Sequence, residues 1–210
     1  MEESTMHDIQ ELLTRVLETH RTGDFDTARS DCAELMANAP DVPDTHFVMG
    51  LLIQDSGDHA GAIQLLGRAI RLDPERSDFH DALGVSQVSL GKHRDGLRSF
   101  AESVRLNPEN RLAVMHLGLL ALRMGLAERS LPCFESLMRM GETSIELICL
   151  RGQALYKMER YTEAMEWLHK CLDMRPNHLD AHRYLGRTLM ALNRYTEAAT
   201  CLRTVADAEA

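Results

Sequence analysis

The chain has 210 residues, 44% of them apolar and 26% charged, which is the balance of a globular protein rather than of a disordered or membrane protein. Its formal net charge is −9, and the whole excess lies in residues 1–108, which hold 19 acidic and 10 basic residues. Phosphate binding needs clustered Lys and Arg, so no nucleic-acid partner is predicted.

The chain begins with an acidic, polar segment, residues 1–8, which lacks the basic and apolar stretches of a secretory signal. The most apolar window, residues 112–127, contains His116 and Arg123 and is shorter than the roughly 20 apolar residues that span a bilayer. Five cysteines without a CxxC pair indicate reduced thiols. We therefore expect a cytoplasmic protein without membrane insertion. Its 20 Arg against three Lys point to a bacterial source.

A period of 34 residues organises the rest of the chain. The five residues RYTEA occur at 160–164 and again at 194–198, and six units of this length follow residue 8 without an insertion. The predicted domain therefore covers residues 9–210, and its repeats are 9–42, 43–76, 77–110, 111–144, 145–178 and 179–210.

Several positions of the repeat keep one kind of residue. Position 8, counted from the first residue of each unit, is glycine in units two to six, which indicates that two helices approach closely there. Position 15 is glycine in four units, position 24 is always apolar, and position 32 is proline in four units, where it ends a helix. Apolar residues between these marks recur at spacings of three and four, which predicts two amphipathic helices and a turn in each repeat.

With these marks the chain resembles the tetratricopeptide-repeat (TPR) family, whose 34-residue helix–turn–helix has the same Leu-Gly, small, aromatic and Pro positions. Residues 82–108 are the clearest copy. The resemblance implies an all-α fold, an α-solenoid in the form of a right-handed superhelix. Unit four departs from the pattern with Pro132 inside its second helix, where we expect a kink.

The sequence contains no catalytic or phosphate-binding motif, so we predict neither an enzyme nor a cofactor. His46, His80 and His182 share position 4 and are interpreted as packing residues. His178 and His182 are four residues apart but lack further ligands nearby in the sequence, so no metal site is predicted. Cys149 is expected to be exposed, with no base placed to activate it.

The resemblance implies that a concave face, lined mainly by positions 2, 5, 9, 12 and 13 of the first helices, binds the partner. Position 2 places acidic residues along one rim. The predicted partner-binding residues, apolar at the N-terminal end and basic at the C-terminal end, are Leu13, Leu17, Phe47, Leu51, Val85, Met115, Leu119, Leu122, Arg183 and Arg187. Such a patch suits an apolar peptide or an amphipathic helix. The alternative is that neighbouring side chains or residues 1–8 cover it, and that the two arginines are solvated or paired with Asp180 or Asp207.

The predicted function is a non-enzymatic scaffold that binds a partner protein in this groove and supports assembly of a multiprotein complex. Two alternatives stay open: the recognition arm of a larger enzyme such as a transferase, and a bacterial secretion, pilus or magnetosome assembly scaffold. Since no solvating helix follows the sixth unit, we also predict a homo-oligomer formed through the C-terminal end, or capping of this end by a partner or a missing domain. The residues expected there are Leu189, Leu192, Leu202 and Val205. The alternative is a monomer in which the stems of Arg187, Arg194 and Arg203 cover this face.

Overall fold

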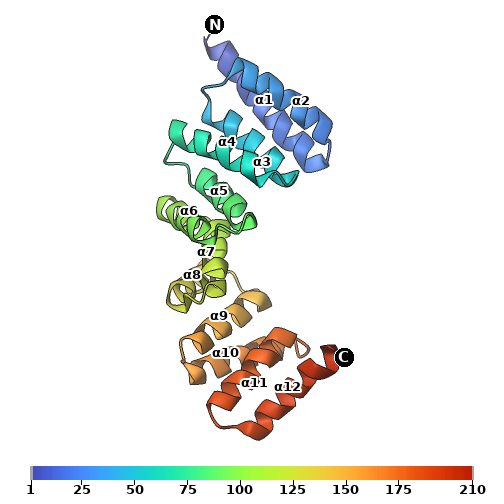
Figure 1. The fold of residues 1–210 in the computed structure, drawn as a ribbon, viewed down its shortest axis with the longest axis vertical. Coiled ribbons are helices and arrows are strands. Elements are labelled where there is room, and N and C mark those ends of the chain that lie inside the picture. The colour runs from blue at the N-terminus through green and yellow to red at the C-terminus, as the bar shows by residue number, and fades with distance from the viewer. Residues whose placement is uncertain (1, 210) are drawn as a thin grey trace. The chain divides into compact units, whose positions relative to one another are not determined.

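A computed structural model describes residues 2–209, apart from the side chains of residues 2–8 and 25. Within this range the chain forms twelve α-helices (Figure 1). Their bounds are α1 Glu2–Thr22, α2 Phe25–Asn38, α3 Pro43–Asp55, α4 His59–Leu72, α5 Ser77–Ser89, α6 His93–Leu106, α7 Arg111–Arg123, α8 Ala127–Arg139, α9 Ile145–Lys157, α10 Tyr161–Met174, α11 Leu179–Ala191 and α12 Tyr195–Glu209. Each predicted repeat holds one pair of helices, which confirms the all-α, helix–turn–helix fold.

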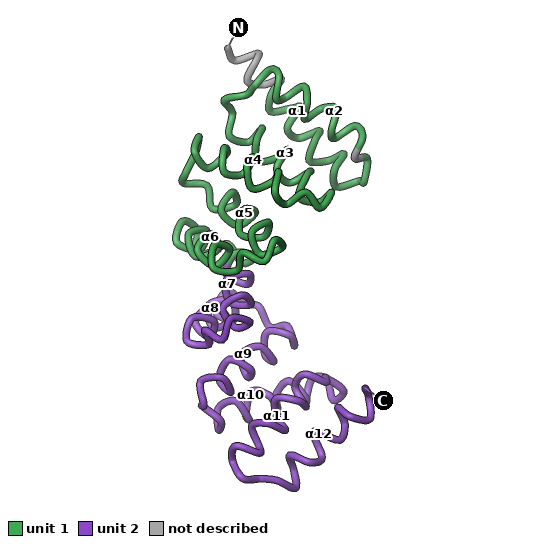
Figure 2. The backbone as a smooth tube through the Cα atoms, in the orientation of Figure 1, with its two compact units in different colours: residues 1–113 green, residues 114–210 purple. Residues whose placement is uncertain are grey.

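The chain divides into two compact units, residues 1–113 and residues 114–210 (Figure 2). In unit 1, each helix from α1 to α5 packs on the next, and α3 also packs on α1 and α5. In unit 2, α8 to α12 pack in the same way, and α9 also contacts α11. First helices of successive repeats are thus neighbours within each unit, as in a solenoid. The prediction of a single domain over residues 9–210 stays a prediction.

The glycines at position 8 confirm the expected close approach of the two helices of a repeat. A Cβ atom placed on Gly84 would lie 2.6 Å from the ring of Phe100, and one on Gly152 would lie 2.8 Å from Leu168. Gly50, Gly118 and Gly186 face the equivalent side chains of their repeats at 2.7–3.0 Å. The facing side chain is always the apolar residue at position 24. These two positions therefore form the core contact of the repeat.

The turn between the two helices has a left-handed residue at position 15 in all six repeats. Four of these residues are glycines, with φ between +74° and +89°, and the other two are Glu159 and Asn193, each with φ of +60°. Glycine adopts this conformation without steric cost, whereas other residues are strained in it. The turns at Glu159 and Asn193 thus keep the left-handed conformation although the residue is not glycine.

The prolines at position 32 follow the ends of helices, as predicted. Helices α2, α4, α6 and α10 each end two residues before the proline. The proline carbonyl groups then accept hydrogen bonds from the histidines at position 4 of the next repeat. Nε2 of His46 lies 2.7 Å from the Pro40 oxygen, Nε2 of His80 lies 3.1 Å from the Pro74 oxygen, and Nε2 of His182 lies 2.7 Å from the Pro176 oxygen. These histidines join successive repeats, which confirms their structural interpretation.

Three further predictions concern single segments. Helix α8 runs through Pro132 as one helix from Ala127 to Arg139. Helix α1 begins at Glu2, so residues 2–8 form its first turns, and whether their side chains cover the groove lies outside the described residues. Among residues 2–209, no helix combines the length and the apolar character that crossing a bilayer requires.

Candidate partner-binding site

Unit 1 contains a pocket of about 530 Å³ between the first helices of its first three repeats. Helices α1 and α3 supply its apolar walls, and the residues around the start of α5 supply a charged rim. The lining residues are Ile9, Gln10, Leu13, Thr14, Leu17, Val42, Asp44, Phe47, Val48, Arg76 and Asp78. The pocket thus combines an apolar floor with one guanidinium and two carboxylates.

Helix α1 reaches both the pocket and the core because its apolar residues follow two stripes. Ile9, Leu13 and Leu17 are four residues apart and therefore lie on one face, the face that lines the pocket. Leu12 and Val16 face the adjacent core of unit 1, where they are buried. Leu17 is 45% exposed, a high value for a leucine in an apolar stripe. Leu17 is thus the exposed residue of this face, whereas Ile9 and Leu13 are partly buried against the core.

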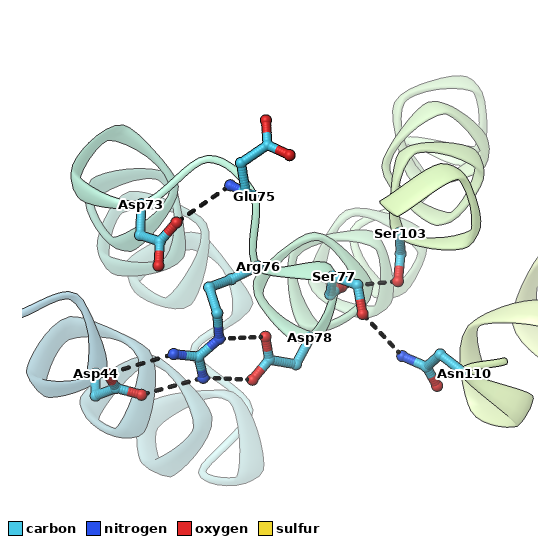
Figure 3. A network of polar contacts seen from close by, with 8 residues as sticks. All are labelled: Asp44, Asp73, Glu75, Arg76, Ser77, Asp78, Ser103 and Asn110. Atoms are coloured by element: carbon cyan, nitrogen blue, oxygen red, sulfur yellow. Dashed lines mark hydrogen bonds and ion pairs between the residues drawn. The ribbon is translucent and has the colours of Figure 1, made fainter. Parts of the chain in front are cut away.

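Arg76 holds the two acidic residues of the rim together (Figure 3). Its Nε and Nη2 donate to the carboxylate of Asp78 at 3.1 and 2.8 Å. Its Nη1 and Nη2 donate to Asp44 at 3.4 and 3.1 Å. The hydrogen bonds to Asp78 are the largest cause of a raised pKa of the Arg76 guanidinium, followed on the raising side by those to Asp44. The rim is thus a preformed, charge-assisted network.

The same arginine connects the rim to the pocket wall. Its guanidinium carbon lies 4.4 Å from the centroid of the Phe79 ring, and the Phe79 and Phe47 rings lie 4.7 Å apart in a tilted arrangement. Phe79 is fully buried, whereas Phe47 is partly buried and lines the pocket. Stacking of this kind restricts the positions of both the guanidinium and the ring. The pocket wall is therefore ordered by contacts within the chain.

Three of the predicted partner-binding residues meet in this pocket, namely Leu13, Leu17 and Phe47. Leu51 instead packs against the buried cluster of Ala62, Leu66 and Ala82, and Val85 is partly buried outside the lining. The roles of all five residues in binding stay predictions.

In unit 2, the predicted apolar residues lie on α7. Met115 and Leu119 are partly buried, but Leu122 is only 4% exposed. The placement of Leu122 on an open surface was wrong, because this side chain is part of the packed interior. Met115 and Leu119 stay predictions.

The two predicted basic residues of unit 2 differ in their environment. Arg183 donates to Asp180 at 2.7 Å and also bonds to Glu209. Arg187 is exposed, with its guanidinium carbon 5.6 Å from the centroid of the Tyr184 ring. Arg183 is therefore paired within the chain. The alternative interpretation expected pairing with Asp180 or Asp207, and the observed partners are Asp180 and Glu209. A carboxylate ligand would have to displace these contacts.

The expectation that Cys149 is exposed was wrong: it is 1% exposed. Its Sγ accepts a hydrogen bond from Nε2 of Gln153 at 3.3 Å, and it lies near Cys171 and His178. Burial raises the pKa of the Cys149 thiol to about 12, so it is protonated at neutral pH. The equivalent residues of the first repeat, Leu13 and Leu17, line the pocket, whereas Cys149 and Gln153 bond to each other.

At the C-terminal end, the structure separates the four residues predicted for self-association. Leu189 and Val205 are 1% and 6% exposed, so both belong to the interior of unit 2 and were wrongly placed on an open face. Leu192 and Leu202 are partly buried, and Leu202 packs against Gly186. Self-association through this end stays a prediction that only Leu192 and Leu202 can carry.

Ile9 and Arg76 are among the lining residues that were not predicted from the sequence. Ile9 was assigned to the first repeat without a role, although its spacing of four from Leu13 was a sufficient signal. Arg76 lies at position 34, outside the helix positions that line the groove, so the repeat pattern gave no signal for it. A smaller hollow of about 360 Å³ between α2 and α3, lined by Arg29 and Met49 among others, contains no predicted residue.

Two family models match parts of the chain. The model described as tetratricopeptide repeat matches residues 82–142. The model described as anaphase-promoting complex, cyclosome, subunit 3 matches residues 113–205. A comparison with curated protein sequences gives no match.

Solved structures with the same fold include three bacterial or TPR proteins of low sequence identity. The solved chain of MamA from Desulfovibrio magneticus RS-1, residue 41 to the end, is 18% identical, with a TM-score of 0.71, over 80% of this chain and 94% of that chain. YrrB, described as a TPR protein with an unusual peptide-binding site, is 17% identical, with a TM-score of 0.77, over 84% and 91%. PilF from Pseudomonas aeruginosa is 16% identical, with a TM-score of 0.73, over 94% and 90%. The repeat marks, the paired helices and the family models that match these parts of the chain together show the tetratricopeptide-repeat fold.

Proposed function

We propose that the protein is a non-enzymatic cytoplasmic scaffold whose unit 1 binds an apolar segment of a partner protein, a peptide or an amphipathic helix, in the pocket between α1 and α3. The TPR fold supports a role in protein interaction. The observation that carries the proposal is the apolar stripe of α1 that lines the pocket, with Leu17 at 45% exposure, facing a rim that is already ordered by Arg76. Exposed apolar side chains gathered in one hollow usually mark a binding site.

The charge of the chain favours one kind of partner segment. Residues 1–108 carry the whole excess of nine negative charges, and Asp44 and Asp78 lie on the pocket rim. An amphipathic helix with apolar residues on one face and Lys or Arg beside them would bury its apolar face on α1 and place its cations in this negative field. The peptide-binding site named for YrrB is consistent with this use of the fold. Assembly of a larger complex would follow if the partner belongs to one.

The proposal is tested by a pair of matched leucine variants. Leu17→Glu places a charge on the pocket wall, whereas Leu112→Glu changes a leucine that is 68% exposed and does not line the pocket. Proteins captured from the native host by the wild-type chain are identified by mass spectrometry. The captured partner's apolar segments are then synthesised and titrated by fluorescence anisotropy.

We expect Leu17→Glu to weaken peptide binding at least tenfold, since it buries an unpaired carboxylate in the complex, and Leu112→Glu to bind as the wild type does. Circular dichroism shows that both variants remain folded. Equal binding by all three proteins would contradict the proposal, as would a peptide that protects α7 rather than α1 from hydrogen exchange. Catalytic turnover of a captured partner would favour the enzyme alternative instead.

A further inference from the structure

Three potential metal ligands meet inside unit 2, outside the proposed partner site. Cys149 lies on α9, Cys171 lies in the last turn of α10, and His178 is the residue that precedes α11. Their ligand atoms all lie within 4.8 Å of one another. Far apart in the sequence, they are positions 5, 27 and 34 of one repeat. The helix–turn–helix and its link to the next repeat are what bring them together.

The burial of the cluster distinguishes it from an accidental surface grouping. Cys149 and Cys171 are 1% and 0% exposed, whereas His178 is only partly buried and therefore gives access from solvent. Gln153 donates its amide N–H to Cys149 Sγ at 3.3 Å. An N–H donor to sulfur stabilises a thiolate and fixes its orientation, which is the usual role of the groups behind a metal ligand. The thiol of Cys171 also forms a hydrogen bond with that of Cys149, and it donates a long one, 3.8 Å, to the carbonyl oxygen of Ile145.

Without a metal the two thiols are unreactive. Burial raises the pKa of Cys149 to about 12 and also raises that of Cys171, so neither forms a nucleophilic thiolate at neutral pH. A divalent cation changes this balance because it binds the thiolate and displaces the proton. Two thiolates and one imidazole are the ligands of choice for Zn²⁺, which also forms sites with three protein ligands and one open position.

We propose that Cys149, Cys171 and His178 bind one Zn²⁺ ion, with solvent in the fourth position on the side of His178. Two thiol protons leave to solvent on binding, and the two thiolate charges neutralise the dication. The ligand atoms of a tetrahedral zinc site lie about 3.3–3.8 Å apart, so a separation of up to 4.8 Å closes by small side-chain rotations. The carboxylates of Glu146 and Asp180 are engaged by Arg175 at 2.8 Å and Arg183 at 2.7 Å, which leaves the three named residues as ligands.

The histidine connects the metal to the joint between repeats five and six. In the structure, Nδ1 of His178 accepts the backbone N–H of Ala181 at 3.2 Å and so caps α11. A neutral imidazole has one nitrogen lone pair, and a bound metal takes it, so the cap is exchanged for a metal bond. The ion would then tie α9, α10 and the start of α11 together. Docking of the last repeat on its neighbour becomes dependent on zinc.

The test uses the full chain, reduced and freed of metal. Zn²⁺ is titrated against a chromophoric chelator, and Co²⁺ is titrated separately for its absorption spectrum. We expect one ion per chain, a near-ultraviolet thiolate-to-cobalt band, tetrahedral visible bands, and a higher melting temperature with zinc. Cys149→Ser and Cys171→Ser should each weaken zinc binding at least a hundredfold. Gln153→Leu, which removes only the N–H donor to sulfur, should weaken it about tenfold.

Three matched variants separate the cluster from other sources of binding. His178→Asn keeps a residue suited to capping α11 but removes the imidazole, so it should lose zinc while circular dichroism stays unchanged. Cys133→Ser changes another buried cysteine of unit 2, and His182→Asn removes the neighbouring histidine, which bonds to Pro176. Both should bind zinc as the wild type does.

The proposal would be overturned by a chain that takes up no stoichiometric zinc, by binding that survives in the two serine variants, or by binding that His182→Asn abolishes. The last would assign the ion to a surface pair of histidines. A Cys149–Cys171 disulfide that persists in the reduced preparation, found by mass spectrometry, would also overturn it. Should a serine variant fail to fold, the cobalt spectrum of the wild type still decides, since it lacks the thiolate band if the cysteines are not ligands.

Discussion

Position 34 of the repeat produces different local structures at two links, the one before α5 in unit 1 and the one before α11 in unit 2. In unit 1 it is Arg76, which binds Asp44 and Asp78 and covers the ring of Phe79. In unit 2 it is His178, which caps α11 and lies beside two buried cysteines. Each residue precedes the first helix of a repeat and so lies where helices of successive repeats meet. The link between repeats can therefore change its chemistry while the repeat itself is kept.

Two of the other links have a side-chain cap, whereas Val42, which precedes Pro43 at the start of α3, has none. Asn110 Oδ1 accepts the N–H of Ala113 at 3.2 Å, and Ser144 Oγ accepts that of Leu147 at 3.4 Å, as His178 does for its own helix. Arg76 forms no such side-chain cap for α5. The missing cap costs about 1 kcal/mol. Arg76 offsets this with four hydrogen bonds to carboxylates, which are the same bonds that order the pocket rim.

The interiors of the repeats, in contrast, are alike, and the largest predicted effect tests this likeness. Gly84→Val in unit 1 and Gly152→Val in unit 2 each push a branched side chain into the residue at position 24, at 2.6 and 2.8 Å from Cβ. We expect each variant to lower the free energy of unfolding by about 2–3 kcal/mol, because close-packed interiors tolerate added volume poorly. Urea unfolding followed by circular dichroism measures the loss.

Gly67→Ala is the control for this pair. Gly67 lies inside α4, where an added Cβ would meet only the end of the Arg71 side chain at 3.7 Å. Alanine should therefore raise the stability by up to about 1 kcal/mol through its helix propensity. The two valine variants should lose similar amounts of unfolding free energy. If their losses differed from each other by more than they differ from the effect of Gly67→Ala, the repeats of the two units would not share one packing rule.

Much of the fold could be predicted because it depends on spacing. Glycine at position 8, proline at position 32 and apolar residues at intervals of three and four are local signals that recur, and the structure confirms the helices that they predict. The candidate sites depend instead on which side chains meet across a link. Cys149 and Leu122 occupy positions that the family leaves open, yet both are buried here. Arg76 lies between elements, where no periodic pattern applies. Burial and pairing of this kind depend on neighbours distant in the sequence.

A second, smaller effect is expected at the Arg76 link. Arg76→Leu removes all four hydrogen bonds and leaves Asp44 and Asp78, which both bond to the same Nη2, facing each other without a cation. Because the three side chains are more than a third exposed, solvent screens the pairs, and we expect a loss of about 1–2 kcal/mol in urea unfolding.

Arg76→Asn sharpens the same comparison. Asparagine at this position can cap α5 as Asn110 caps α7, so this variant should lose about 1 kcal/mol less than Arg76→Leu. Arg98→Leu, which removes a side chain that is 81% exposed and paired at 3.5 Å, should change stability by less than about 0.5 kcal/mol. Equal losses for Leu and Asn at position 76 would contradict the view that this link exchanges a cap for an ion network.

The smallest effect concerns the turn inside the repeat, where the two units also differ. Unit 1 has glycine at all three of its left-handed turn positions, whereas unit 2 has Gly125, Glu159 and Asn193. A φ of +60° costs a non-glycine residue about 1–2 kcal/mol. Replacement by glycine removes this cost, but part of the resulting stabilisation is lost because glycine gives the unfolded chain more conformational freedom. Glu159→Gly should therefore stabilise the protein by about 0.5–1 kcal/mol, and Asn193→Gly by less, because asparagine tolerates this conformation better than glutamate does. Urea unfolding of both variants, with Gly91→Ala as the reverse change in unit 1, measures the effect. A Glu159→Gly variant less stable than the wild type would show that the Glu159 side chain contributes more to this turn than its strained backbone costs.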